Sequence, residues 1–101
     1  AIPEINMTRV QHLIAILGEE GVEVSQRTTK ALRFGLNEIQ PEQEFDNSER
    51  IMIEMSDMIA VYETLVDEGI LPPVERELVD KKKEKVEKFL RYSDEQGMVT
   101  K

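Results

Sequence analysis

The residues with the clearest chemical potential are two short acidic motifs. Glu20 and Glu23 are three positions apart in the first motif, and Glu54 and Asp57 are three apart in the second. Residues at this spacing project from the same side of an α-helix, so each motif presents two carboxylates together. Paired carboxylates of this kind bind divalent cations or act as general acids and bases.

Both motifs lie among apolar residues rather than on clearly polar helix faces. Leu17 and Val24 share the sector of Glu20, and Glu54 is interleaved with Ile51 and Met58. Carboxylates in a partly desolvated interior have strongly raised pKa values unless cations lie between them. Hard, oxygen-preferring Mg²⁺, or Mn²⁺ in its place, satisfies that requirement. The alternative, in which both motifs are simply exposed helix surface, stays open.

Composition excludes several classes of function. The chain has no cysteine, which removes disulfides, thiolate catalysis and iron–sulfur clusters. Its net charge of −8 repels polyanions and argues against binding of nucleic acid. A nucleoside triphosphate is also repelled unless divalent cations occupy the carboxylates. The sequence contains neither a Gly-x-x-x-x-Gly-Lys phosphate loop nor a paired-glycine dinucleotide motif.

Three helices are expected to position the two motifs. Apolar periodicity predicts a first helix from Asn6 to about Phe34, capped by Asn6 or Thr8. The markers of its one broad apolar face are Val10, Leu13, Ile14, Leu17, Val24 and Leu32. A second helix is expected from Asp46 or Asn47, where Asp46 and Glu49 have capping-box spacing, to about Glu68, and a third from Val74 to about Tyr92.

These elements predict one all-α domain over residues 1–101, with a flexible tail from about residue 93. Gly18 and Gly21 lie inside the first helix, where glycine is unfavourable, so something other than helix propensity must account for them. The second helix is apolar on more than one side, so three helices would leave part of it uncovered. We therefore expect a helical bundle completed by oligomerisation.

No apolar run approaches the roughly 20 residues that cross a bilayer, and no basic segment precedes an apolar core at the N-terminus. We expect a cytoplasmic protein that does not enter membranes.

The motifs Glu20-Gly21-Val22-Glu23 and Glu54-Met55-Ser56-Asp57 resemble those of the MazG-like all-α nucleoside triphosphate pyrophosphohydrolases, in which Glu-x-x-Glu on one helix faces Glu-x-x-Asp on another. Glu19 and Val24 match the residues that often flank the first motif. The likeness covers about Leu13 to Leu65. The segment from Lys30 to Gly35 is similar to that of short, single-domain, phage-type members.

The resemblance implies Mg²⁺-dependent hydrolysis of (d)NTP to (d)NMP and pyrophosphate by a homodimer or homotetramer. The four motif carboxylates would hold the metal, and Glu19 or one of the four would accept a proton from the attacking water. Lys30 and Arg33 follow on the same helix and are the nearest cations for the pyrophosphate group, with Arg27 and Arg50 as further candidates.

Two rival interpretations remain from sequence. One is a non-catalytic helical interaction module with a structural or vestigial metal site. The other is a related pyrophosphohydrolase that acts on phosphoribosyl-ATP. The base and sugar preference, the number of metal ions and the identity of the general base stay open.

Overall fold

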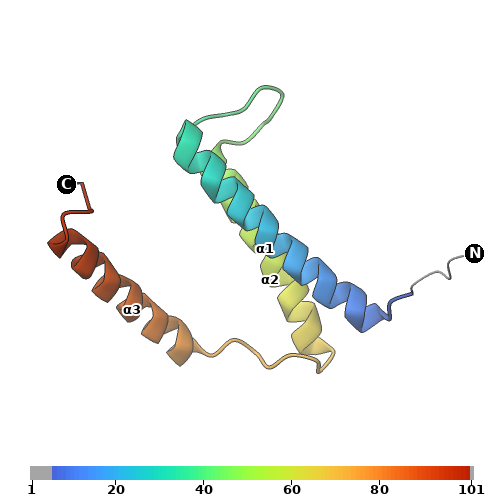
Figure 1. Cartoon of the computed structure of the whole chain (residues 1–101). Helices are drawn as coiled ribbons and strands as arrows, with labels where there is room; N and C mark the ends of the chain where they lie inside the picture. Colours follow the sequence, from blue (N-terminus) through green and yellow to red (C-terminus); the bar gives the residue numbers. More distant parts are fainter. Residues whose placement is uncertain (1–5, 101) are drawn as a thin grey trace, which may run out of the picture.

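The chain folds into three α-helices, as the computed structural model of residues 6–100 shows (Figure 1). Within these residues there is no β-strand, which confirms the all-α prediction. The helices α1 and α2 lie side by side and antiparallel, whereas α3 lies apart from both (Figure 1). The helices are α1 (Arg9–Phe34), α2 (Asn47–Asp67) and α3 (Arg76–Glu95).

Side-chain caps fix where the first two helices begin. The Thr8 hydroxyl accepts a hydrogen bond from the backbone N–H of Gln11, and the Gln11 side chain accepts one from the N–H of Thr8, so α1 begins after Thr8 rather than at Asn6. The capping box of Asp46 and Glu49 is confirmed at the start of α2. Gly69, with φ of +74°, follows the end of α2 in a conformation that glycine adopts without strain.

The third helix differs slightly from its expected bounds. It begins at Arg76 and ends at Glu95, so residues 93–95 of the expected tail are helical. Ion pairs between Arg76 and Asp80 at 2.7 Å and between Lys81 and Glu77 at 3.1 Å run along its exposed surface. The remainder of the expected tail includes Lys101, which lies outside the described residues.

The contact between α1 and α2 follows a seam whose residues are spaced alternately three and four apart, the spacing of antiparallel coiled coils. Every seam residue is buried or half-buried, and four of them are polar. Of the hydrophobic residues among positions 6–100, only Ala31 and Leu65 are fully buried. The seam consists of Val10, Leu13, Leu17, Glu20, Val24, Arg27 and Ala31 on α1, and of Asn47, Ile51, Glu54, Met58, Val61 and Leu65 on α2.

The expectation of one broad apolar face on the first helix was wrong. Val10 and Leu17 belong to the seam, but Leu32 is 89% exposed and Ile14 is 49% exposed. Both residues follow a seam residue by one position, which turns them about 100° away from α2. The apolar residues of α1 therefore form two separate stripes.

Helices α1 and α2 form an antiparallel hairpin, and hydrogen bonds at both of its ends fix the register between the two helices. At one end, Asn47 is 1% exposed and its amide donates hydrogen bonds to the Gly35 carbonyl at 2.8 Å and to Glu38 at 3.2 Å. At the other end, the Arg9 guanidinium donates two hydrogen bonds to the Glu68 carboxylate at 2.9 and 3.0 Å. This register determines which side chains meet in the middle of the seam.

None of the helices described here is both long enough and apolar enough to cross a membrane.

Candidate metal centre

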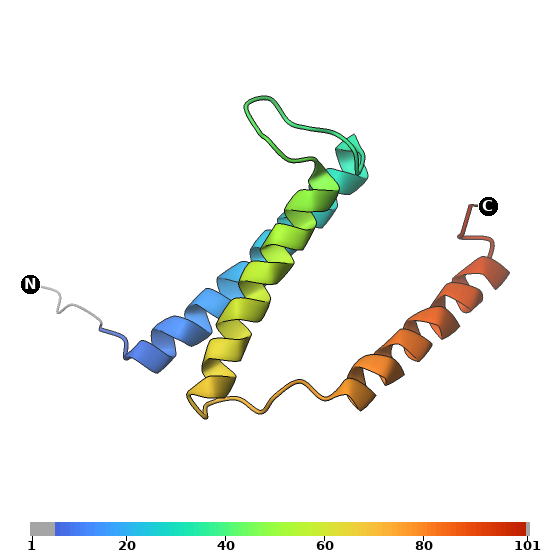
Figure 2. The same ribbon diagram turned by 180° about the vertical axis from the view of Figure 1, so that it is seen from behind.

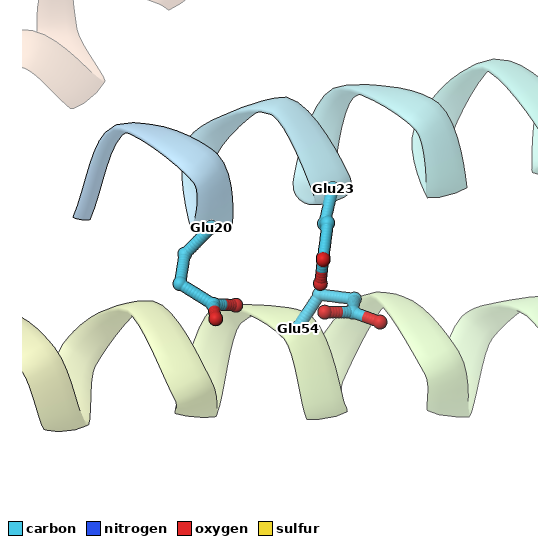
Figure 3. A group of neighbouring side chains, drawn as sticks. All are labelled: Glu20, Glu23 and Glu54. Carbon is cyan, nitrogen blue, oxygen red and sulfur yellow. The ribbon is translucent and has the colours of Figure 1, made fainter. Parts of the chain in front are cut away.

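The hairpin register brings acidic residues of both motifs together at the middle of the seam. Figure 3 shows Glu20 and Glu23 extending from α1 toward Glu54 on α2. One carboxylate oxygen from each of the three residues lies within 4.8 Å of the others. Glu20 and Glu54 are seam residues and are half-buried, whereas Glu23 is exposed at the edge of the cluster. The cluster is therefore most open to solvent at Glu23.

The surroundings of the cluster disfavour its negative charge. Glu20 and Glu54 each have one buried carboxylate oxygen, Oε2, with no hydrogen-bond partner. Desolvation raises the pKa of Glu20, and the charges of Glu23 and Asp57 raise it further. A hydrogen bond with Glu23 raises the pKa of Glu54, followed by desolvation and by the neighbouring negative charges. A bound cation would relieve all of these unfavourable interactions.

The donor set fits a hard divalent cation. Mg²⁺ binds carboxylate oxygens at about 2.0–2.1 Å, so two of its ligands lie at most about 4.2 Å apart. Three oxygens on one octahedral ion cannot all lie opposite one another, and neighbouring ligands are about 3 Å apart. The oxygens of Glu20, Glu23 and Glu54 lie within 4.8 Å of one another, so rotation of these side chains would have to bring them closer by up to about 2 Å for all three to bind one ion. Oxygen-only ligation favours Mg²⁺ or Mn²⁺ over zinc, which prefers nitrogen and sulfur.

The other two predicted acidic residues lie at the margin of the cluster. Asp57 and Glu19 are exposed. Asp57 acts on both Glu20 and Glu54 through its charge, and Glu19 contributes the weakest of the charge effects on Glu20. The predicted role of Asp57 as a fourth ligand and that of Glu19 in proton transfer stay predictions.

The predicted anion-binding cations lie further along α1. Lys30 is half-buried and Arg33 is exposed, and both border a shallow hollow on the outer side of the helix. The guanidinium of Arg33 lies 4.8 Å from the centre of the Phe34 ring, in cation–π contact. Arg50, a further candidate, donates a hydrogen bond to Gln40 at 2.8 Å.

Arg27, a further candidate from the sequence, is a half-buried residue of the seam. Its Nη1 atom is buried and has no hydrogen-bond partner. Arg27 follows Glu20 by seven residues, so the two share the seam about 10 Å apart along the helix axis. The heptad spacing from Glu20 is the signal that identifies it, because that spacing returns to the same face of a coiled coil.

Comparisons with protein-family models, curated proteins and solved structures gave no match to this chain. The resemblance to MazG-like enzymes is therefore carried by the two acidic motifs.

Proposed function

We propose that this chain is a Mg²⁺-dependent nucleoside triphosphate pyrophosphohydrolase, which converts (d)NTP into (d)NMP and pyrophosphate. The observation that carries the proposal is the cluster of Glu20, Glu23 and Glu54, whose oxygens lie within 4.8 Å of one another. Two of these carboxylates have buried oxygens without a hydrogen-bond partner. Such an arrangement is costly without a cation and well suited to holding one.

The chain's own residues divide the work of the proposed reaction. Glu20, Glu23 and Glu54 would hold the metal, with Asp57 completing the set from the exposed edge. The bound ion would supply Lewis-acid stabilisation of phosphate oxygens and a more acidic coordinated water. Glu19 is exposed and lies outside the set of three, and it would serve as the proton acceptor for the attacking water.

The triphosphate chain would run along α1 from the acidic cluster toward the basic residues. Arg27 and Lys30 follow the first motif by one to two helical turns, and both are half-buried. Side chains on a helix lean toward its N-terminus, so both cations lean toward the carboxylates. The unpaired guanidinium nitrogen of Arg27 makes it the stronger candidate for contact with the leaving pyrophosphate. Lys30 and Arg33 would extend this positive surface.

A substrate panel tests the reaction class. Ribo- and deoxynucleoside triphosphates and phosphoribosyl-ATP are incubated with Mg²⁺, with Mn²⁺ or with excess chelator, and pyrophosphate is measured. We expect release of pyrophosphate only with metal, and loss of release in Glu20→Gln and Glu54→Gln. Glu84→Gln, a matched change on the exposed surface of α3, should retain activity.

Two other outcomes have defined meanings. Release from phosphoribosyl-ATP alone would change the substrate while retaining the metal chemistry. Binding of Mn²⁺ without turnover of any substrate would contradict the enzymatic proposal and favour a non-catalytic helical module. Self-association into a homodimer or homotetramer belongs to the proposal as well.

A further inference from the structure

Helix α3 is amphipathic but packs against neither of the other helices (Figure 2). Val79, Val86, Phe89 and Leu90 lie along one side of it, and charged residues cover the other side. Phe89 is 55% exposed and Leu90 is 49% exposed. In proteins most of the stability of a helix comes from the packing of its apolar side, so this side of α3 needs a partner surface.

The α1–α2 hairpin carries a second stripe that also lacks cover. Each residue of this stripe directly follows a seam residue in the sequence. Because α1 and α2 are antiparallel, the stripe on α1 and the stripe on α2 then lie on the same side of the hairpin. We call this surface the open face, and most of its residues are exposed. It consists of Ile14, Gly18, Gly21, Ser25, Thr28 and Leu32 on α1, and of Met52, Met55, Ile59, Tyr62 and Val66 on α2.

Two glycines on the open face have no steric reason within their own chain. Gly18 and Gly21 lie inside α1, although glycine is among the poorest helix formers. A Cβ atom built at either position meets no atom within 4 Å. Absence of a side chain is useful where another backbone approaches closely. Close packing of a helix from outside the chain would account for both residues.

The connection between α2 and α3 is anchored to α2 by hydrogen bonds. The Tyr62 hydroxyl donates a hydrogen bond to the Pro72 carbonyl at 2.7 Å, and the N–H of Ile70 donates to the Leu65 carbonyl at 2.9 Å. Pro72 and Pro73 then restrict the backbone before α3 begins. Folding α3 back onto its own hairpin would require this anchored connection to rearrange.

The surface between α2 and the start of α3 is hollowed and mainly apolar. A hollow of about 880 Å³ is lined by Met55, Ile59 and Val66 of α2 and by Val74 and Val79 near the start of α3. Its charged lining residues are both acidic, and lysines border the apolar side of α3. Charge complementarity therefore favours α3 as the occupant of this surface. The acidic residues are Glu63 and Asp67, and the lysines are Lys82, Lys83 and Lys85.

The exposed area indicates how much surface a partner must cover. The chain exposes 8449 Å², whereas a compact monomer of this mass exposes about 5,900 Å². The excess exposed area is roughly 2,600 Å², more than the ~800 Å² that each partner buries in an interface of standard size. It lies near the upper end of the area that each partner buries in obligate homodimers. The radius of gyration of 18.1 Å also exceeds the ~13 Å expected for a compact chain of this length.

We propose that two copies of this chain form a two-fold dimer in which α3 of each copy lies on the open face of the other. The two contacts are identical by symmetry, so in each copy both the open face of the hairpin and the apolar side of α3 are covered by the partner. A second copy supplies both the apolar stripe and the lysines that match this surface. The proposal does not depend on the enzymatic function.

The absence of cysteine allows a direct test by cross-linking. Ile59→Cys on the open face is mixed, in turn, with Val79→Cys, Val86→Cys or Phe89→Cys on α3, and each mixture is oxidised after subunit exchange. Because each chain carries a single cysteine, a disulfide can form only between copies. We expect a mixed disulfide species of twice the chain mass in at least one mixture and none when Glu84→Cys replaces the α3 variant.

A second variant set separates packing from folding. Gly21→Leu has room within its own chain, so circular dichroism should show an unchanged or increased helix content. Because the added side chain enters the proposed interface, we expect the dimer dissociation constant to rise roughly tenfold or more. Gln26→Leu, on the same helix but away from the open face, should leave the constant unchanged.

Three results would overturn the proposal. The first is a monomer with a radius of gyration near 13 Å in small-angle scattering. The second is a dimer in which none of the α3 variants cross-links to Ile59→Cys. The third is a dimer whose dissociation constant is unaffected by Gly21→Leu.

Discussion

Neutralising Glu54 should stabilise the metal-free protein and remove its response to Mg²⁺. Glu54 is half-buried at the centre of the seam, and its carboxylate lies within 4.8 Å of oxygens from Glu20 and Glu23. Glutamine has the same shape but no charge. The Glu54→Gln variant therefore removes repulsion from the empty cluster and, at the same time, removes a metal ligand.

The size of the effect follows from the separation of the charges. Two unit charges 4.8 Å apart repel by about 0.9 kcal/mol even at the dielectric constant of water. Repulsion of Glu54 by both Glu20 and Glu23 would be nearly twice that value. Solvent screening at this half-exposed site reduces the expected gain in the free energy of unfolding to about 1 kcal/mol. For a domain of this size, that gain raises the melting temperature by about 4–8 °C.

The gain should depend on pH in a defined direction. The pKa of Glu54 is raised in the folded protein, first by a hydrogen bond with Glu23 and then by desolvation. The folded wild type therefore holds this proton more tightly than the unfolded chain does. The contribution of Glu54 to stability is therefore most favourable below the ordinary carboxyl pKa and is lost as the pH rises through the raised value. The advantage of Glu54→Gln should accordingly appear as the pH rises through that window and be complete above it.

The assay is thermal unfolding followed by circular dichroism at one fixed protein concentration, with chelator or with Mg²⁺. Mg²⁺ at 100 times its dissociation constant should stabilise the wild type by about 2.7 kcal/mol and reverse the order of the two melting temperatures. Glu84→Gln should match the wild type in both conditions. The reasoning would be refuted if Glu54→Gln melted at a lower temperature than the wild type in chelator. It would also be refuted if Mg²⁺ raised the melting temperature of Glu54→Gln as much as that of the wild type.

Three further predictions concern the hairpin and its cations. Asn47→Ala should cost about 2 kcal/mol in urea unfolding, because it removes the buried hydrogen bonds to the loop, whereas the exposed Asn37→Ala should cost little. Asp46→Ala should lower the melting temperature at neutral pH, because it removes the cap of α2. A hydrogen bond from Ser48 lowers the pKa of Asp46, so the difference in melting temperature between wild type and variant should shrink as the pH falls through that pKa. A difference that does not change with pH would contradict this. Arg27→Gln should weaken triphosphate binding at least tenfold in calorimetry while leaving Mn²⁺ affinity within about twofold, and equal losses of both would contradict its proposed contact with phosphate.

Local sequence signals were sufficient to place the helices. Thr8 and Asp46 have the residue types and partners that cap a helix, and both cap one. The three-residue spacing within each acidic motif placed Glu20 beside Glu23 on one side of α1. These signals act within one or two helical turns, so the sequence contains them in full.

The features that depend on contacts between helices were harder to predict. Ile14 and Leu32 were assigned to the same face as Val10 and Leu17 because one broad apolar face and two adjacent stripes give similar patterns in one sequence. The register between α1 and α2 depends on the ties made by Asn47 and Arg9, which involve partners distant in the chain. The buried position of Arg27 follows only once the seam is known.

Amphipathicity likewise predicted α3 without identifying its partner surface. The pattern of Val79, Val86 and Leu90 shows that one side of the helix needs cover. Within the chain, α3 packs against neither α1 nor α2. What covers α3 is a property of the assembly, which the pattern of a single chain does not specify.

Phosphorus NMR of the reaction products tests the central proposal most directly. The protein is incubated with each nucleoside triphosphate in Mg²⁺, and parallel samples contain chelator or the Glu54→Gln variant. We predict equal amounts of nucleoside monophosphate and pyrophosphate in Mg²⁺, and neither product in the parallel samples. Formation of nucleoside diphosphate and inorganic phosphate, or no turnover of any nucleotide by a protein that binds the metal, would contradict the account.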